Sequence, residues 1–298
     1  MRQVCTADEI RTATVLGAGA MGAGIAQVLA QAGIETRLFD INDEVVKKGL
    51  ESIATMLAKG VERGKLTADD MTATVGRLTA TSDMTASLEG SDLVIEAAPE
   101  KLELKQQIFA DVAKVVSADA IVASNTSSIS IAALAEADTN PERFLGLHFF
   151  NPPPLMPLLE IVHGPKTNPA VVATCKELAH LWGKEPIVVK DSPGFASSRL
   201  GVAIGLEAIR MLEEGIASAA DIDKAMELGY RHPMGPLKLT DMIGIDVRVH
   251  IAEYLASKLG DARFAPPALM RQMVAEGKLG MKTGQGFYKW NGRKPVLE

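Results

Sequence analysis

Residues 14–40 read TVLGAGAMGAGIAQVLAQAGIETRLFD, and this stretch decides the fold. A short apolar run leads into Gly17-x-Gly19-x-x-Gly22, which opens an Ala- and Leu-rich helical segment. A second apolar, strand-like run follows that segment and ends on Asp40. A strand, a glycine turn, a helix and a second strand in this order predict the start of a doubly wound α/β sheet.

Each glycine of this pattern has a physical role. Gly17 permits the tight turn, Gly19 lets the backbone approach a pyrophosphate, and Gly22 allows the helix to pack closely on the strand. The helix N-terminus offers N–H groups and a partial positive charge to the phosphates. Asp40 follows Gly22 by 18 residues, near the spacing at which a carboxylate meets the ribose hydroxyls of a dinucleotide. Because a carboxylate there repels a 2′-phosphate, the pattern predicts NAD rather than NADP as the cofactor.

The composition excludes several classes of protein. With 47% hydrophobic and 23% charged residues, the chain of 298 residues can bury the core of one large or two modest domains. The net charge of −6 argues against a nucleic-acid or anionic-membrane partner. Cys5 and Cys175 lie far apart, which predicts neither a disulfide nor a structural metal site. We expect a cytoplasmic protein, since the sequence shows neither a signal-peptide core nor a run of about 18 apolar residues.

The pattern of elements changes near residue 190. Before this point, short apolar runs alternate with helical stretches, which predicts a Rossmann-type, mostly parallel sheet covered on both faces. After it we expect only helices, whose apolar faces are compatible with a subunit interface. The predicted fold class is therefore α/β, with a cofactor domain over residues 1–188 and a smaller all-helical domain over residues 189–298. The expected helices of the second domain span residues 194–214, 219–229, 236–260 and 266–276.

Polar side chains follow two of the predicted strands, and one carboxylate lies inside a third. Ligands of open α/β sheets bind beyond the carboxyl ends of the strands. A serine-rich segment, residues 124–128, follows one strand, and His148 lies at the end of the next. Glu160 lies within an apolar strand, where a carboxylate is costly unless it is paired. A histidine is the partner that offsets this cost most easily, so we expect the side chains of His148 and Glu160 to form a hydrogen bond.

These residue types suit the oxidation of an alcohol by NAD. A histidine can take the hydroxyl proton as hydride leaves the carbon, and a carboxylate on its other nitrogen fixes the tautomer. A serine hydroxyl can hold the substrate oxygen, and no metal is needed. Two simpler interpretations stay open, namely a packed core histidine and a serine-rich loop that only caps a helix.

Motifs along essentially the whole chain resemble those of the L-3-hydroxyacyl-CoA dehydrogenase family, which includes bacterial 3-hydroxybutyryl-CoA dehydrogenases. Their length and their order make the resemblance specific. The motifs are LGAGAMGAGIAQ (16–27), DLVIEAAPE (92–100), SNTSSISI (124–131), HFFNPPPLMPLLEIV (148–162), DSPGF (191–195), EGIASAADIDKAMELG (214–229), HPMGP (232–236) and GMKTGQGFY (280–288).

The resemblance implies a role for each residue of the catalytic group. It makes His148 the general base and Glu160 the partner that orients it, and it places Ser127 against the carbonyl or hydroxyl of the substrate. It also implies a small helical domain that forms a homodimer and closes on the cofactor domain. The segment 233–236 would then shape the acyl pocket.

The resemblance also assigns residues to the cofactor. Asn125 and Asn151 would lie along the nicotinamide and its ribose. Glu100 and Lys105 fall where the family meets the cofactor, and so does Lys282 near the C-terminus.

Two regions need a separate interpretation. The family pattern PGFxxNR contains an asparagine that joins the active-site hydrogen bonds, and Ser198 occupies its position here. Serine is shorter and offers one hydroxyl, so a direct bond can become water-mediated and the rate or substrate preference can change. A neutral variant within a subgroup is the interpretation that we favour. The helical stretch 43–66 is lysine-rich, and Lys59 is our single choice for the 3′-phosphate of CoA. A solvated charged face is the other interpretation.

The sequence thus predicts an NAD-dependent, reversible oxidation of an (S)-3-hydroxyacyl-CoA, with 3-hydroxybutyryl-CoA as the expected short-chain substrate. A dehydrogenase of a free hydroxy or sugar acid and a non-catalytic NAD-binding protein are the alternatives. The acyl chain length is left open, and a dicarboxylic acyl-CoA also fits.

Overall fold

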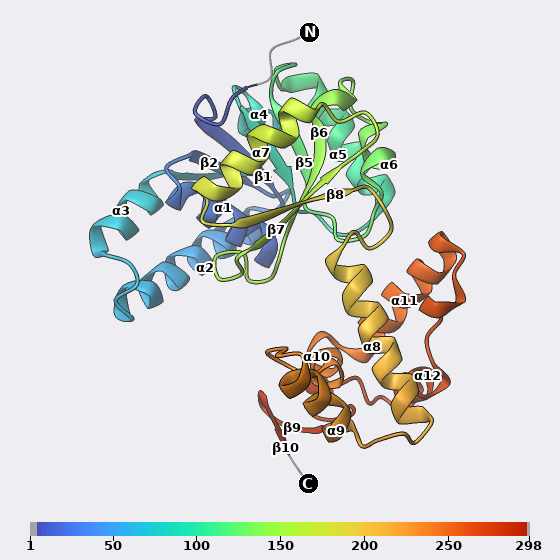
Figure 1. Cartoon of the computed structure of the whole chain (residues 1–298). Helices are drawn as coiled ribbons and strands as arrows, with labels where there is room; N and C mark the ends of the chain where they lie inside the picture. The colour runs from blue at the N-terminus through green and yellow to red at the C-terminus, as the bar shows by residue number, and fades with distance from the viewer. Residues whose placement is uncertain (1–4, 297–298) are drawn as a thin grey trace. The chain divides into compact units, whose positions relative to one another are not determined.

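A computed structural model describes residues 5–296, and the chain divides into two compact units between Ser192 and Pro193 (Figure 1). The boundary lies a few residues after the point that the sequence pattern indicates, because the last strand of the sheet, β8 (Glu185–Lys190), belongs to the first unit. Among residues 5–296 no helix combines the length and the apolar character needed to cross a bilayer.

The first unit is built on a mostly parallel sheet, as predicted. Its eight strands follow the order β3-β2-β1-β4-β5-β6-β7-β8, and only the pair β6·β7 is antiparallel. The strands β4 and β5 are buried along their whole length, which explains why they read as continuous apolar runs. The first seven strands are β1 (Thr12–Leu16), β2 (Glu35–Phe39), β3 (Leu78–Thr81), β4 (Leu93–Glu96), β5 (Ile121–Ser124), β6 (Phe144–Phe149) and β7 (Leu158–His163).

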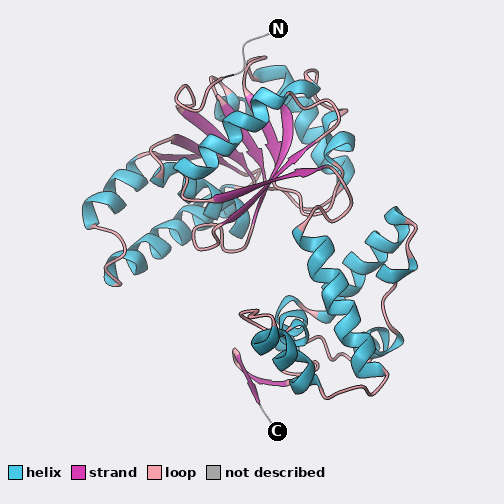
Figure 2. Ribbon diagram, in the orientation of Figure 1, coloured by secondary structure: helices cyan, strands magenta, loops and turns pink. Residues whose placement is uncertain are grey.

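Helices cover both faces of this sheet (Figure 2). The region between β2 and β4 contains two short helices and the edge strand β3, which the sequence analysis did not predict. Strand β3 lies at the sheet edge and is only partly buried, so its residues show no apolar run. The helices of this unit are α1 (Ala20–Gln31), α2 (Asp43–Glu62), α3 (Ala68–Gly76), α4 (Met84–Leu88), α5 (Leu102–Val115), α6 (Ile131–Ala135) and α7 (Pro169–Leu181).

The second unit is helical with one short hairpin at its end. The single helix expected over residues 236–260 is wrong, because Gly244 has φ 107° and divides it into two. The hairpin of β9 (Lys289–Asn291) and β10 (Lys294–Val296) was not predicted. The helices are α8 (Ser197–Glu213), α9 (Ala219–Lys224), α10 (Pro236–Ile243), α11 (Ile245–Leu259) and α12 (Ala268–Ala275).

A buried carboxylate joins the chain end to α10. Asp241 is fully buried and accepts hydrogen bonds from the backbone N–H groups of Phe287 and Tyr288 and from the indole of Trp290. Burial raises the pKa of Asp241, although these hydrogen bonds oppose the rise. The contact explains why a polar residue lies inside the core of this unit.

Candidate active site

The glycine turn between β1 and α1 is built so that two of its three glycines have no room for a side chain. A Cβ on Gly22 would lie 1.7 Å from the carbonyl oxygen of Gly17. Gly17 itself has φ +105°, and a Cβ there would lie 2.8 Å from the carbonyl oxygen of Ala97. A Cβ on Gly19 meets nothing within 4 Å. The outer glycines are therefore required by the fold, whereas Gly19 leaves open space at the N-terminus of α1, as a phosphate cradle needs.

Asp40 lies directly after β2, at the carboxyl end of the strand. Its Oδ2 accepts a hydrogen bond of 2.9 Å from the backbone N–H of Ala18, inside the glycine turn. Within residues 5–296 no donor reaches Oδ1. Because a carboxylate has two acceptor oxygens, Asp40 can hold the turn with one and accept from ribose hydroxyls with the other. The glycine turn and Asp40 together fit an adenine dinucleotide.

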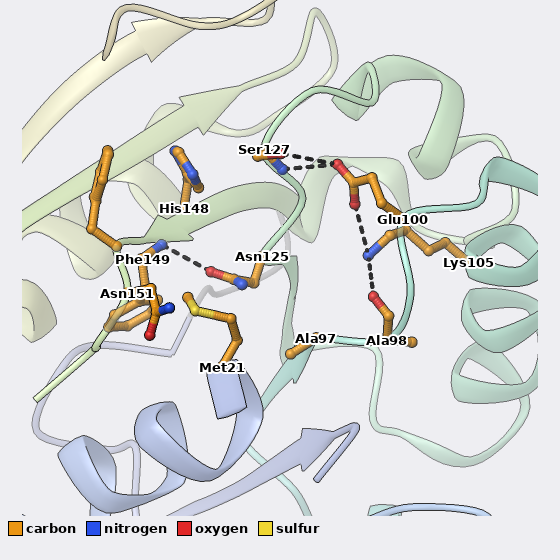
Figure 3. Close-up of a pocket in the computed structure, with 11 residues that line it drawn as sticks. Met21, Ala97, Ala98, Glu100, Lys105, Asn125, Ser127, His148, Phe149 and Asn151 are labelled. Atoms are coloured by element: carbon orange, nitrogen blue, oxygen red, sulfur yellow. Dashed lines mark hydrogen bonds and ion pairs between the residues drawn. The ribbon is translucent and has the colours of Figure 1, made fainter. Parts of the chain in front are cut away.

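A pocket of about 310 Å³ opens at the carboxyl ends of the three central strands, β4, β5 and β6 (Figure 3). This edge of a doubly wound sheet is where ligands of such folds bind. The residues that line the pocket are Met21, Ala97, Ala98, Glu100, Lys105, Asn125, Ser127, His148, Phe149, Phe150 and Asn151. Six of the residues that the sequence singled out line this pocket, namely Glu100, Lys105, Asn125, Ser127, His148 and Asn151.

His148 and Glu160 are brought together by the pairing of their strands. The antiparallel register of β6 and β7 places the two residues opposite each other, and His148 Nδ1 lies 2.7 Å from Glu160 Oε2. Glu160 is fully buried and His148 is 7% exposed. An ionised carboxylate only accepts, so Nδ1 carries the proton and Nε2 is the basic nitrogen. The geometry is that of a base held by a carboxylate.

The serine-rich loop after β5 is held by Glu100. Oε1 of Glu100 accepts a hydrogen bond of 3.0 Å from the N–H group of Ser127 (Figure 3). It also accepts hydrogen bonds from the hydroxyl of Thr126 at 2.6 Å and from the N–H group of Ser128 at 3.2 Å. Burial alone would raise the pKa of Glu100, but the ammonium of Lys105 and these donors outweigh burial and lower it. Glu100 is therefore ionised and fixes the loop that presents Ser127.

Lys105 is itself held by a residue that the sequence analysis missed. The side chain of Lys105 is 1% exposed. The ammonium lies 2.6 Å from Oε1 of Glu96, 3.3 Å from Oε2 of Glu100 and 3.1 Å from the carbonyl oxygen of Ala98. Glu96 is fully buried at the end of β4. The sequence contained a sign of this pair, because Glu96 is a carboxylate inside an apolar strand, as Glu160 is, and such a carboxylate needs a partner.

Two asparagines complete the pocket wall. Asn125 Oδ1 accepts a hydrogen bond of 2.9 Å from the backbone N–H of Phe149, which leaves its amide NH₂ as a donor at the pocket (Figure 3). Asn151 precedes a cis peptide bond to Pro152 and lines the pocket next to Phe150. Both residues lie where the sequence places them, at the ends of neighbouring strands.

Three of the singled-out residues belong neither to the pocket lining, nor to the glycine turn with Asp40, nor to the pair of His148 and Glu160. Lys59 lies in the last turn of α2. Ser198 lies in the first turn of α8, in the second unit. Lys282 also belongs to the second unit, where its ammonium lies 2.6 and 2.7 Å from the two carboxylate oxygens of Asp246. Their roles stay predictions.

Comparison with known proteins gives matches along most of the chain. Residues 12–192 match the family model for the NAD binding domain of 3-hydroxyacyl-CoA dehydrogenase, and residues 194–290 match the model for its C-terminal domain. A probable 3-hydroxybutyryl-CoA dehydrogenase of Deinococcus radiodurans is 43% identical, over 93% of this chain and 99% of the relative. The solved structure of (S)-3-hydroxybutyryl-CoA dehydrogenase from Ralstonia eutropha has a TM-score of 0.91 at 42% identity and covers 95% of this chain and 99% of its own. A 3-hydroxyadipyl-CoA dehydrogenase of Escherichia coli is 42% identical over 97% of this chain, which spans 61% of that relative.

Proposed function

The chain belongs to the 3-hydroxyacyl-CoA dehydrogenase family and is an NAD-dependent dehydrogenase of that class, and we propose that it oxidises a short-chain (S)-3-hydroxyacyl-CoA reversibly. The simplest substrate is (S)-3-hydroxybutyryl-CoA, the substrate in the names of the Deinococcus and Ralstonia relatives. The observation that carries the proposal is the buried pair of His148 and Glu160 at a pocket beside the glycine turn.

The reaction removes a hydride from C3 of the substrate and a proton from its hydroxyl group. NAD⁺, held by the glycine turn and Asp40, would supply the hydride acceptor for this reaction. His148 takes the proton at Nε2 as the C3 carbonyl forms, and the carboxylate of Glu160 stabilises the imidazolium through Nδ1–H. In the reverse direction, the imidazolium returns the proton to the oxygen of the 3-oxoacyl group.

The remaining polar groups position the reactants. We assign the hydroxyl of Ser127 to the substrate oxygen, because Glu100 fixes its loop at the pocket. The amides of Asn125 and Asn151 are assigned to the nicotinamide and its ribose. Glu100 and Lys105, which contact each other, are assigned to the cofactor as well. Gly17, Gly19, Gly22 and Asp40 would hold the adenosine diphosphate part of the cofactor.

The other assignments follow from the resemblance. Ser198 would take part in the active-site hydrogen bonds in place of the family asparagine, Lys282 would reach the cofactor, and Lys59 would pair with the 3′-phosphate of CoA. We also propose that the protein acts in the cytoplasm as a homodimer formed through its helical unit.

The test is NADH oxidation by the purified protein, followed by absorbance, with acetoacetyl-CoA and with unesterified acetoacetate. The two compounds share the reacting ketone and differ in the thioester. We expect turnover confined to acetoacetyl-CoA. Equal or faster turnover of acetoacetate would favour a dehydrogenase of hydroxy acids instead. Tight NADH binding without turnover of either compound would favour a non-catalytic protein.

A further inference from the structure

Glu96 is a buried carboxylate near the pocket, and stability alone does not explain its presence. It ends β4, is fully buried and accepts three hydrogen bonds of 2.6 Å. The backbone N–H of Ala98 and the ammonium of Lys105 donate to Oε1, and the hydroxyl of Ser124 donates to Oε2. Buried ion pairs contribute little net stability, because the loss of hydration offsets the attraction between the charges. A carboxylate in this place therefore indicates a role other than stability.

The first route from Glu96 to the serine-rich loop runs through Ser124. The parallel register of β4 and β5 pairs these two residues, so their side chains lie next to each other on one face of the sheet. The hydroxyl oxygen of Ser124 also accepts a hydrogen bond of 3.2 Å from the backbone N–H of Thr126. The carbonyl oxygen of Glu96 accepts a hydrogen bond of 2.7 Å from the backbone N–H of Asn125. Glu96 thus holds the first two residues of the loop that follows β5.

The second route runs through Lys105 and Glu100. The ammonium of Lys105 lies between two carboxylates, 2.6 Å from Glu96 and 3.3 Å from Glu100. Glu100 in turn accepts a hydrogen bond of 3.0 Å from the backbone N–H of Ser127, and the Ser127 hydroxyl lies 3.4 Å from the same oxygen (Figure 3). The hydroxyl of Thr126 donates to this oxygen as well, at 2.6 Å, which joins the two routes. Glu96 therefore closes a ring of hydrogen bonds around the loop that presents Ser127.

The residues that Glu96 holds separate it from the pocket. Among residues 5–296, those that line the pocket include Glu100, Lys105 and Ser127, but Glu96 is not one of them. Ser127 is exposed, and at 3.4 Å the hydrogen bond from its hydroxyl to Glu100 is long and weak, so the hydroxyl can turn to a substrate oxygen. The position of this hydroxyl depends on the backbone of the loop, and the ring holds that backbone.

We propose that Glu96 is a positioning residue for the reaction, because its carboxylate sets where the hydroxyl of Ser127 lies in the pocket. This inference rests on the proposed function, which assigns that hydroxyl to the substrate oxygen. In Glu96→Gln one of the two acceptor oxygens becomes an NH₂ group, and among residues 5–296 Lys105 keeps Glu100 as its only carboxylate partner. The stronger pairing draws Glu100 away from the loop and shifts Ser127. A shift of about 1 Å can lower a rate by about 10²-fold.

The experiment is a double-mutant cycle between Glu96→Gln and Ser127→Ala. It measures kcat for the NADH-dependent reduction of acetoacetyl-CoA, with both reactants at saturation so that changes in binding do not enter. We expect Glu96→Gln alone to lower kcat by about tenfold or more. In the Ser127→Ala protein, which lacks the hydroxyl to be positioned, the same substitution should lower kcat less than about threefold. A purely structural role would lower kcat by the same factor in both backgrounds, because the two sites would then act independently.

Asp138→Asn is the matched control. Asp138 is a buried carboxylate of the same unit and lies 3.0 Å from the guanidinium of Arg143. It precedes β6 and therefore lies at the edge of the sheet opposite the pocket. The substitution should lower Tm, because it breaks a buried ion pair, and should leave kcat within about twofold of the wild type.

The outcomes distinguish a positioning role from a structural one. Equal losses of kcat from Glu96→Gln in the two backgrounds, or turnover like that of the wild type, would overturn the inference and leave the reaction class intact. A wild-type protein that binds NADH but does not turn over acetoacetyl-CoA would refute the proposed function, and the inference with it. If Glu96→Gln does not fold, Ser124→Ala replaces it in the cycle, since it removes the first route alone. Its loss of kcat should be smaller and should disappear in the Ser127→Ala protein, and an equal loss in both backgrounds would again overturn the inference.

Discussion

Because the space at Gly19 is open, a Gly19→Ala substitution should lower the affinity for the cofactor while leaving the stability of the fold nearly unchanged. A Cβ on Gly19 meets nothing within 4 Å, and its backbone, at φ −66° and ψ −174°, is one that alanine adopts without strain. Gly19→Ala reduces the conformational entropy of the unfolded chain, which raises the free energy of unfolding by about 0.4–1 kcal/mol. The substitution also replaces a good N-cap residue of α1 with a poor one, which lowers the free energy of unfolding by about 0.5–1 kcal/mol. The two effects nearly cancel, so Tm should change by less than about 4 °C.

The affinity for the cofactor should fall, because the new methyl group occupies the space through which the pyrophosphate approaches the backbone. We expect the Kd of NADH to rise about tenfold or more, which corresponds to about 1.4 kcal/mol. Titration of NADH fluorescence and a thermal melt of the same sample measure the two quantities.

Gly22→Ala is the matched control. Its Cβ would lie 1.7 Å from the carbonyl oxygen of Gly17, so the turn must move. Overpacking of this kind costs about 1–3 kcal/mol, which lowers Tm by roughly 3–10 °C. A Gly19→Ala protein that binds NADH like the wild type, or that melts as low as Gly22→Ala, would refute the assignment of this space to the cofactor.

Three further predictions use the same assays. Glu160→Gln removes the charge that stabilises the imidazolium of His148, so turnover of acetoacetyl-CoA should fall about 10²-fold or more, and unchanged turnover would exclude Glu160 from the mechanism. Asp40→Ala removes the carboxylate that repels a 2′-phosphate, so the ratio of kcat/KM for NADH over NADPH should fall, and a constant ratio would show that Asp40 does not contact the ribose. Burial raises the pKa of the Cys175 thiol to about 12, so it stays protonated at pH 8 and should react with a disulfide reagent only after unfolding; rapid reaction of the native thiol would contradict its burial.

Much of the first unit could be predicted because its signals are local. The glycine turn, the helix after it and the buried strands are each specified by residues that are adjacent in sequence. The expectation that Glu160 meets His148 used only the cost of an unpaired buried carboxylate and the suitability of a histidine as its partner. The same reasoning applied to Glu96 would have found the partner of Lys105.

Other features depend on distant contacts or on backbone angles that no pattern encodes. The break between α10 and α11 depends on the positive φ of Gly244, and glycine also occurs inside continuous helices such as α8. Arg248 of α11 reads in the sequence as an ordinary surface cation, yet it is buried because α8 packs against it. Long-range burial of this kind is visible only in the folded chain.

The central claim is that His148 is the base of an NAD-dependent dehydrogenase. It is tested most directly by His148→Ala, with turnover of acetoacetyl-CoA and the Kd of NADH measured on the same preparation. The account predicts that turnover falls by about 10²–10⁴-fold, because proton transfer to the imidazole is lost, while NADH binds within a few-fold of the wild type. Turnover that survives the substitution would contradict the claim, and simultaneous loss of NADH binding would mean that His148 supports the cofactor site rather than the chemistry.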